Sequence, residues 1–345
     1  MPAAKRISII MEWENVQFAE DARAGKVLAA LAAQADALLS ASGHGSREIA
    51  APIELLVLFD DASAVQGEIE AVLQRAVGTT SSLLVRVVAT AGLSYFSLKN
   101  RGVQLSTGDL IVFLDSDVIP QPGWLATLVG SFDDPEVQVV GSRAFVRGES
   151  AYSRTVALTW FFQPLPETAE LLPVEHFHAN GVAFRRAVAV ANPFPETPGQ
   201  SRGAGWDLAN QLQAQGTRLH EHSGALLDHP PPHGLRNYAR RALVHGSDDL
   251  LSIRRRKGKY SGRLSLSIRR TARKWRQALA NLICHRRRVG LSWPAMPLAV
   301  AFVSFYFGCY LVGDLQARLA SSARPADEKV GGLVSRWPLR LWQQA

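Results

Sequence analysis

The sequence predicts an α/β protein with a mostly parallel central sheet flanked by helices. Short runs rich in Ile, Leu and Val alternate with helical stretches through the first two-thirds of the 345 residues, which is the pattern of repeated β-α-β units. Acidic residues follow three of these predicted strands. Because ligands bind beyond the carboxyl ends of parallel strands, the acidic ends indicate which edge of the sheet carries a site.

The predicted elements follow in order along the chain. Strands are expected at RISIIM, IELLVLF, LLVRVVA and DLIVFL, with helices over about 18–40, 64–76 and 94–106 between them. Further strands are expected over 137–145 and at HFHANGVAFRR, RLHEH and GALLDHP, with a helix over about 206–215. Three prolines at 230–232 and a change of charge after them place a boundary there, so we expect a catalytic domain over 1–232.

The C-terminal third is first basic and then apolar. Residues 234–288 hold 17 Lys and Arg against two acids, in a chain whose formal net charge is +8. The uncharged run 291–313 follows, and a basic cluster before an apolar run with Trp293 is typical of bilayer-bound segments. We therefore expect a basic helical region over 233–290, a hydrophobic membrane-associated segment over 291–313 and a tail over 314–345.

How the apolar run meets the bilayer is left open by its length. A helix from Pro297 to Val312 would be about 24 Å long, against a hydrocarbon core of about 30 Å. Basic residues lie on both sides of it, so a peripheral, re-entrant or single-pass segment is equally consistent, and a buried helix is the alternative. No apolar signal run precedes the first strand, and the two cysteines form no disulfide framework, so we expect the cytoplasmic face of the membrane.

The stretch GDLIVFLDSDVIPQPGW carries the clearest chemistry. Asp115 and Asp117 stand two residues apart at the end of a buried strand, so both carboxylates can reach one site. Oxygen ligands suit Mg²⁺ or Mn²⁺ rather than zinc, and a cation there would neutralise a leaving diphosphate. A chance Asp-x-Asp in a turn is the alternative, and the second strand-end pair, Asp60 and Asp61, makes it weaker.

With these residues in view, the chain resembles glycosyltransferase family 2 over about residues 6–229. The resemblance implies the GT-A nucleotide-diphospho-sugar transferase fold and an inverting, non-processive, metal-dependent transfer. The donor implied is a nucleotide-diphosphate sugar, with a UDP-sugar as the first choice, and the acceptor is a glycan or lipid-linked molecule of polysaccharide or glycolipid biosynthesis. The expected partner beyond donor and acceptor is an anionic membrane surface, with no nucleic acid.

The resemblance assigns the donor contacts to residues in strand-end turns and in the stretch before the metal motif. EWEN, which closes the first strand, fits the family turn through Asn15, while SLKNRGVQLSTGD and HFHANGVAFRR resemble later family stretches. Helix capping is the alternative for the second strand-end pair. The donor-binding set is Glu14, Asn15, Asp60, Asp61, Lys99, Asn100, Asp115, Ser116, Asn180 and Gly181.

The resemblance also assigns the general base. The family carries Glu-Asp-x-Asp-Leu at the start of a helix, where this chain has Ala204-Gly205-Trp206-Asp207-Leu208. Asp207 is thus the candidate for the carboxylate that takes the proton of the acceptor hydroxyl. A capping role for Asp207, a base role for Glu196, and a catalytically silent glycosyltransferase-like membrane partner are the alternatives.

The third metal ligand expected from the resemblance is His229, so the metal set is Asp115, Asp117 and His229. An imidazole ligand favours Mn²⁺ over Mg²⁺. His220 and His222 are weaker candidates.

Two further assignments rest on composition. The aromatic loop Trp160, Phe161 and Phe162 offers stacking area to an acceptor, with core packing as the alternative. The rival classes are a sugar-nucleotide pyrophosphorylase, for which EWEN lacks glycine and positive charge, and a nucleic-acid-binding protein, whose motifs are not evident.

Overall fold

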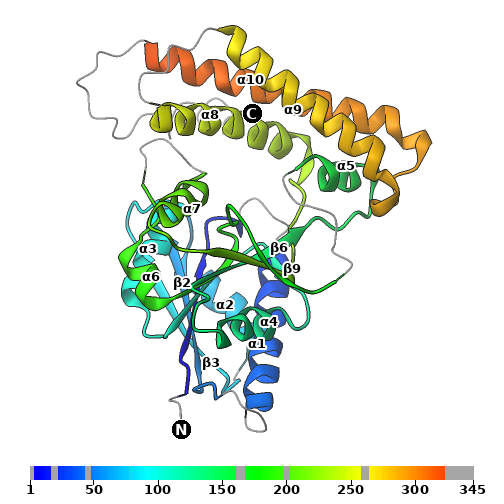
Figure 1. The fold of residues 1–345 in the computed structure, drawn as a ribbon. Coiled ribbons are helices and arrows are strands. Elements are labelled where there is room, and N and C mark those ends of the chain that lie inside the picture. The colour runs from blue at the N-terminus through cyan, green and yellow to red at the C-terminus, as the bar shows by residue number, and fades with distance from the viewer. Residues whose placement is uncertain are drawn as a thin grey trace.

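The computed structural model describes residues 4–16, 22–42, 48–78, 80–160, 168–196, 203–257 and 264–322. Within these ranges one sheet has the strand order β3-β2-β1-β4-β8-β6-β9-β5, and β7 pairs with β9 (Figure 1). The strands are β1 (Ile7–Glu12), β2 (Ile53–Asp60), β3 (Leu83–Thr90), β4 (Leu110–Leu114), β5 (Ile119–Pro120), β6 (Val139–Phe145), β7 (Leu171–Pro173), β8 (Gly181–Arg185) and β9 (Leu219–Asp228).

The first half of the sheet is parallel. β1 pairs with β2 and β4, and β2 pairs with β3, all in parallel register. β1 and β4 are buried along their whole length, as expected for strands covered by helices on both faces. Because these strands run the same way, their carboxyl ends meet at one edge.

The second half mixes directions. β8 runs antiparallel to both β4 and β6, and β9 runs parallel to β6. β9 also pairs antiparallel with the short β5, where Ile119 lies opposite Asp228. Because of this pairing, the end of β9 lies beside the segment that follows β4.

Two layers of helices cover the sheet. One core contains α1 (Arg23–Ser42), α2 (Gln66–Ala76) and α4 (Trp124–Gly130). The other contains α3 (Tyr95–Leu105), α6 (Arg186–Ala191) and α7 (Ala204–Ala214). The side chains of β1 divide between the two cores, with Ile9 and Met11 in the first and Ile10 in the second, because successive residues of a strand face opposite sides.

A layer of three long helices lies on one side of this domain (Figure 1). It comprises α8 (Gly234–Lys257), α9 (Leu264–His285) and α10 (Met296–Ser322), with α10 packed against both of the others and α5 (Ala151–Thr159) beneath. Tyr152 of α5 anchors the layer, since its ring meets Tyr238 and Phe302 edge to face at 5.3 and 5.2 Å. Its hydroxyl donates to the Pro232 carbonyl at 2.8 Å.

Three expectations about the elements are wrong in detail. RLHEH and GALLDHP form one ten-residue strand, β9, because Ser223 exchanges hydrogen bonds with Glu170 and keeps the backbone extended through the Ser-Gly break. The apolar helix continues to Ser322 because Asp314 and Arg318, which end the uncharged run, pair with each other at 2.8 Å. Helix α5 occupies residues for which only a loop near Trp160 was expected.

Candidate functional site

The parallel strand ends bring three carboxylates together. In the register of the sheet, Glu12 at the end of β1 lies beside Leu58 of β2, two residues before Asp60. Ile10 lies beside Phe113 of β4, two residues before Asp115. The predicted cluster of acidic strand ends is therefore present at this edge.

Asp115 is held by three donors, two from α3 and one from the turn after β1. Lys99 Nζ of α3 lies 2.7 Å from Asp115 Oδ1, the Tyr95 hydroxyl donates at 2.8 Å, and Asn15 Nδ2 donates to Oδ2 at 3.0 Å. The carboxylate itself is only 4% exposed. Asp115 thus organises the strand ends, whatever it does for a ligand.

Asn15 links this network to a second buried carboxylate. Its Nδ2 donates to Glu12 Oε1 at 2.8 Å, and its backbone N–H donates to Oε2 at 3.3 Å. Burial, and then the negative charge of Asp115, raise the pKa of Glu12 well above its usual range, although Lys99 acts in the opposite direction. Glu12 therefore favours its neutral form in this site.

The expected phosphate-facing role of Lys99 is wrong. Its side chain is fully buried, and Nζ lies 4.7 Å from the centroid of the Tyr95 ring and 5.6 Å from that of Phe113. An ammonium desolvated in this way needs the paired Asp115 carboxylate close by. Lys99 therefore stabilises the site by holding the Asp115 carboxylate in place.

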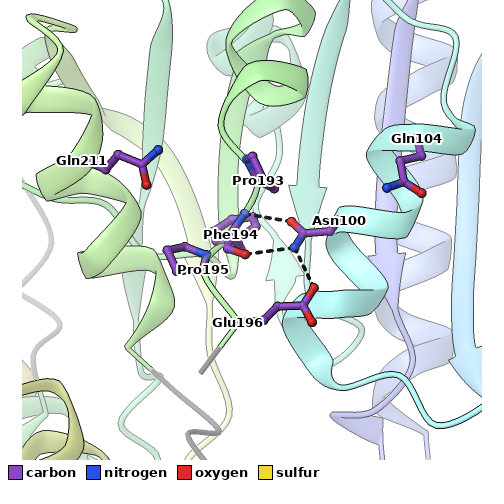
Figure 2. Close-up of a pocket in the computed structure, with 7 residues that line it drawn as sticks. All are labelled: Asn100, Gln104, Pro193, Phe194, Pro195, Glu196 and Gln211. Atoms are coloured by element: carbon purple, nitrogen blue, oxygen red, sulfur yellow. Dashed lines mark hydrogen bonds between the residues drawn. The ribbon is translucent and has the colours of Figure 1, made fainter. Parts of the chain in front are cut away.

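Asn100 holds the loop that carries Phe194 and Glu196 (Figure 2), and its contact with the donor stays a prediction. Its side-chain amide accepts from Phe194 N at 2.8 Å and donates to Phe194 O at 2.9 Å and to Glu196 Oε1 at 3.1 Å. These hydrogen bonds of Asn100 lie beside a shallow pocket, shown in Figure 2. The pocket is lined by Asn100, Gln104, Pro193, Phe194, Pro195, Glu196 and Gln211.

Asp117 and His229 lie at facing ends of β5 and β9. Arg23 of α1 connects the two segments, donating from Nε to the Asp117 carbonyl at 2.5 Å and from Nη2 to the Asp228 carbonyl at 2.6 Å. Asp117 is 1% exposed and His229 is 6% exposed. The tertiary fold therefore brings the segment of the Asp-x-Asp motif beside the segment that carries His229, more than a hundred residues away in sequence.

The hydrogen bond of His229 assigns its tautomer. Nδ1 lies 2.8 Å from the Pro230 carbonyl, an acceptor only, so Nδ1 carries the proton and the lone pair is on Nε2. A histidine oriented by a carbonyl in this way is the usual form of a metal-ligating imidazole. His229 can therefore offer Nε2 to a cation.

The residues present form no ready-made three-ligand site. No group of three or more His, Cys, Asp or Glu side chains poised around a common metal position is found in the described ranges. Asp115 is paired with Lys99, and the set of Asp115, Asp117 and His229 stays a prediction, in which Asp117 and His229 would offer a carboxylate and the Nε2 of an imidazole. Such a pair fits a cation that takes its remaining ligands from a diphosphate.

Two buried polar atoms next to the motif also fit a polar ligand. Within the described part of the chain, Ser116 Oγ and Asn180 Oδ1 are buried and make no hydrogen bond. Buried polar atoms are normally paired, so each of them calls for a partner. Asn180 is joined to the motif through its carbonyl, which accepts from Asp115 N at 3.1 Å.

Gly181 contributes space rather than a contact. A Cβ at this position would overlap the end of the Leu227 side chain and crowd Ser142, so a larger residue here would require Leu227 to move.

The predicted base- or ribose-binding residues are partly assembled. Glu14 Oε1 accepts from Ser63 Oγ at 2.6 Å and from Asp60 N at 3.4 Å. Asp60 Oδ1 accepts from Gly92 N at 2.7 Å, while Asp61 is exposed. The ends of β1, β2 and β3 are thereby locked together beside the buried network.

Asp207 lies in the first turn of α7. Its backbone N–H bonds to the Gly203 carbonyl at 3.2 Å, and its side chain is 9% exposed. The turn rests against the strand-end segment, because the Cβ position of Gly205 is 3.4 Å from Ala179, next to Asn180. The positive end of the helix dipole favours the ionised carboxylate there.

Of the predicted aromatic loop, the structure describes only Trp160, which is buried in the core. Trp160 is 7% exposed and packs edge to face on His229 at 5.5 Å, so its acceptor-stacking role is wrong, while Phe161 and Phe162 lie outside the described residues. The exposed aromatic near the candidate base is instead Trp206, which is 45% exposed and stacks on His176 at 3.8 Å.

Several residues of the site were not found from the sequence. Tyr95 stands four residues before Lys99 on α3, and this helical spacing is the signal that could have paired them on Asp115. Arg23 offers no such signal, since its partners come from β5 and β9. The half-exposed Arg147, 3.3 Å from Asp228 Oδ2, adds a cation beside the same segments.

A family model describing glycosyl transferase family 2 matches residues 48–190. Over these residues the chain is similar to glycosyl transferase family 2. The match includes the Asp-x-Asp motif and ends before Asp207 and His229, so the roles of those two residues rest on their geometry.

Curated relatives support the family. The pre-mycofactocin glycosyltransferases of two Mycobacterium tuberculosis strains, CDC 1551 / Oshkosh and ATCC 25618 / H37Rv, are each 34% identical over 163 residues. The alignment covers 45% of this chain and 34% of each relative, so it spans about a third of the relatives' length.

A solved structure supports the GT-A fold. The mannosyltransferase PcManGT from Pyrobaculum calidifontis, in complex with GDP-Man and Mn²⁺, superposes with a TM-score of 0.50 at 16% identity. The superposition covers 91% of this chain and 88% of the mannosyltransferase chain. At this identity the likeness is one of fold.

Proposed function

We propose that this family 2 protein is an inverting, metal-dependent glycosyltransferase that uses a nucleotide-diphosphate sugar, with a UDP-sugar as the first donor to test. The observation that carries the proposal is the junction of the Asp-x-Asp motif with His229 through Arg23 at the carboxyl edge of the sheet. The family match and the bound GDP-Man and Mn²⁺ of the Pyrobaculum mannosyltransferase support it.

The donor is proposed to lie along the strand ends. The nucleoside meets Glu14, Asp60 and Asp61, and the diphosphate lies near Asp117 and His229. These two residues would hold Mn²⁺ or Mg²⁺, which when bound supplies positive charge to the leaving diphosphate. The neutral form favoured by Glu12 keeps one negative charge away from that diphosphate.

The proposed transfer is a single displacement. The acceptor hydroxyl oxygen bonds to the anomeric carbon as the bond from that carbon to the diphosphate oxygen breaks, which inverts the configuration. The hydroxyl proton passes to a carboxylate oxygen of Asp207, and the nucleoside diphosphate leaves with the bonding electron pair. Asp207 suits this role because it lies in the turn beside Asn180.

The acceptor is proposed to be a glycan or a lipid-linked molecule presented at the cytoplasmic face of a membrane. Trp206 supports an apolar or sugar-ring contact, since its exposed ring stands one residue before Asp207 and is steadied by His176. The apolar C-terminal helix supports the membrane location.

Replacing the two acids separates binding from catalysis. Asp207→Asn is expected to lower kcat by about 10²- to 10⁴-fold with unchanged donor affinity, because only proton transfer is removed. Asp117→Asn is expected to weaken Mn²⁺-dependent donor binding about tenfold or more. Calorimetric donor titration with Mn²⁺ and product detection by mass spectrometry measure both effects.

The exposed Glu70→Gln on α2 serves as the matched control and should behave as wild type. Full turnover by Asp207→Asn would remove it as the base. Tight donor binding without transfer or hydrolysis in the wild-type protein would favour the catalytically silent partner instead.

A further inference from the structure

The outward face of α10 is apolar and uncovered. Leu298, Phe305, Val312 and Leu319 are 50%, 45%, 47% and 70% exposed and recur on one side of the helix. No charged residue interrupts this side between Pro297 and Val312. Large exposed apolar faces of this kind mark contact with another apolar phase or partner.

The opposite side of α10 is tied to α8 and α9 by polar contacts. Asp314 is fully buried and pairs with Arg270 of α9 and with Arg318, and it accepts from Ser267. Tyr310 donates to Asp249 of α8, which also pairs with Lys274 of α9. These polar contacts of Asp314 and Tyr310 hold the second half of α10 against α8 and α9.

Glycine brings α8 and α10 into backbone contact. A Cβ at Gly246 would fall on the Tyr310 carbonyl oxygen, and one at Gly313 would fall on the Leu243 carbonyl oxygen. The two helices can cross this closely only with glycine at both points. α10 is therefore an integral part of a three-helix layer, not a separate rod.

Basic side chains border the apolar face. Arg269, Arg273 and Arg276 are exposed on the solvent side of α9, next to exposed Leu264 and Ile268. At the start of α10, Trp293 is 60% exposed, and the Arg286 guanidinium lies 4.1 Å from its ring centroid. Apolar side chains with Arg and Trp at their rim are the composition of an interfacial membrane surface.

We propose that α9 and α10 dock the protein in the plane of an anionic bilayer, with the outward face of α10 in the acyl boundary and no crossing of the membrane. Two described helices, Arg23–Ser42 and Trp293–Leu319, are long and apolar enough to cross. The first is a core helix, since Val27, Leu28 and Leu31 are fully buried. The second would draw Asp314, Arg270 and Lys274 into hydrocarbon if it crossed, which is strongly unfavourable.

Charge argues for lipid over a second copy of the chain. A face-to-face pair would bring the arginines at the rims of two identical surfaces together without acids between them. An anionic headgroup layer neutralises the same arginines. The proposal deepens the proposed membrane location, and its test uses neither donor nor acceptor, so its failure is separate from failure of glycosyl transfer.

Vesicle flotation of the full chain tests the surface. Phosphatidylcholine vesicles that contain phosphatidylglycerol should bind the wild-type protein, and phosphatidylcholine alone should bind it about tenfold more weakly. Leu298→Glu with Phe305→Glu, and separately Arg269→Glu with Arg273→Glu, should each lower binding about tenfold or more. Val65→Glu with Leu84→Glu, at exposed apolar positions elsewhere, should not lower it.

Circular dichroism melting confirms that each variant folds. Wild-type binding retained by the folded Leu298→Glu, Phe305→Glu variant would overturn the proposal. So would a dimer in analytical ultracentrifugation that this variant dissociates, because the face would then belong to a second copy.

A cysteine-labelling experiment tests the in-plane arrangement. In a chain with Cys284→Ser and Cys309→Ser, Ser322→Cys places one thiol at the last residue of α10. A membrane-impermeant maleimide added outside the vesicles should label it before detergent is added. Labelling only after detergent would mean that α10 crosses, and would overturn the in-plane arrangement.

Discussion

The buried network of Glu12, Asn15, Asp115 and Lys99 shows how single residues define the site. Two carboxylates and one ammonium share a space with almost no water, so the cluster lowers its net charge by favouring the neutral form of Glu12. An amide at Asn15 is suited to this place because it donates to both acids. Asn15, the residue that fits the family turn, therefore also links the ends of β1 and β4.

Glu12→Gln is expected to raise stability at neutral and alkaline pH. An acid whose pKa is raised in the folded state loses its stabilising contribution as pH rises from its usual value through the raised one. Glutamine keeps an oxygen that accepts from Asn15 Nδ2, gives up the longer bond from Asn15 N, and removes this loss. Urea unfolding between about pH 5 and about pH 9 should show a flatter dependence for the variant.

The exposed Glu136→Gln is the control for that series, and its pH dependence should follow wild type. A variant less stable than wild type at every pH would show that Glu12 is ionised and needed as a charge.

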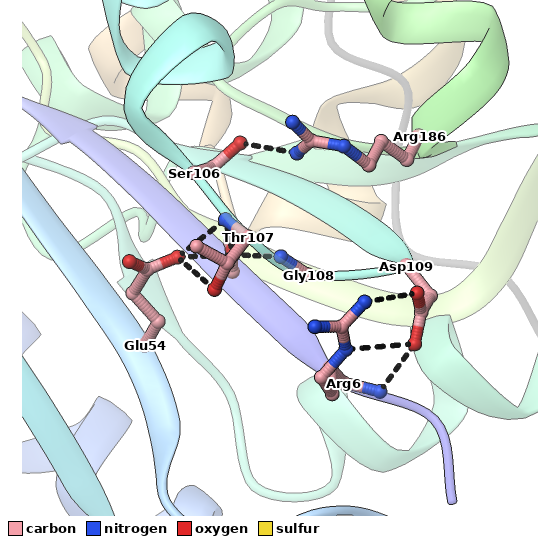
Figure 3. A network of polar contacts seen from close by, with 8 residues as sticks. Arg6, Glu54, Ser106, Thr107, Gly108, Asp109 and Arg186 are labelled. Atoms are coloured by element: carbon pink, nitrogen blue, oxygen red, sulfur yellow. Dashed lines mark hydrogen bonds and ion pairs between the residues drawn. The ribbon is translucent and has the colours of Figure 1, made fainter. Parts of the chain in front are cut away.

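At the scale of elements, a second polar network closes the opposite edge of the sheet (Figure 3). Glu54 of β2 accepts from Ser8 Oγ at 2.5 Å, Thr107 N at 2.9 Å and Arg86 at 3.0 Å. Ser8 Oγ in turn accepts from Gly108 N at 2.7 Å. The turn between α3 and β4 is thus bound to β1 and β2, which holds β4 and its Asp-x-Asp end in register.

Glu54→Gln is expected to cost about 1.5–3 kcal/mol of stability at neutral pH, because it weakens several hydrogen bonds to a charged acceptor. Burial opposes ionisation, but Ser8, Thr107 and Arg86 together lower the pKa of Glu54. The stabilising contribution of such an acid is present above the usual Glu pKa and is lost as pH falls through the lowered one. The difference between variant and wild type should therefore shrink in acid.

Asp109→Asn provides the comparison, since its pair with Arg6 is about half exposed and should contribute much less than the Glu54 network. Denaturant unfolding of both variants gives the two values. Equal losses would show that burial of Glu54 adds nothing to its network.

At the scale of the whole molecule, Trp160 connects the layer of α8, α9 and α10 to His229, the proposed metal ligand. Trp160 lies against His229, and Arg241 and His245 of α8 lie 5.9 and 6.3 Å from its ring. His245 also bonds to Tyr306 of α10. The proposed membrane-docking layer and the proposed donor site therefore share a contact.

Trp160→Phe is expected to weaken Mn²⁺-dependent donor binding several-fold while leaving kcat at saturating donor nearly unchanged. The smaller ring loosens the packing that orients His229, whereas Asp207 lies elsewhere. Phe302→Leu, which alters contacts with Tyr152 and Tyr238 in the same helical layer, serves as the control. A loss in kcat alone, or equal effects of both variants, would contradict a positioning role for Trp160.

Much of the fold could be predicted from periodicity and strand-end chemistry. Continuous apolar runs identified the parallel strands, and Asp60 and Asp115 were placed at the correct edge because strand ends are local features of sequence. Lys99 was assigned to the donor because nothing local distinguishes a buried Lys from one that faces a ligand. Its burial depends on Tyr95 and Phe113, which pack around its ammonium group.

The sequence by itself determined the α/β class, the family resemblance and the presence of an apolar C-terminal helix, because composition and spacing are properties of short stretches. Only the tertiary structure decided that the segment of Asp117 lies beside that of His229, since β5 and β9 pair across more than a hundred residues. It also decided that one face of α10 is tied to charged helices and the other is free. An apolar run has the same length whether it spans a bilayer or lies on it. The two arrangements are distinguished by the charged residues of α8 and α9 that contact the other side of α10.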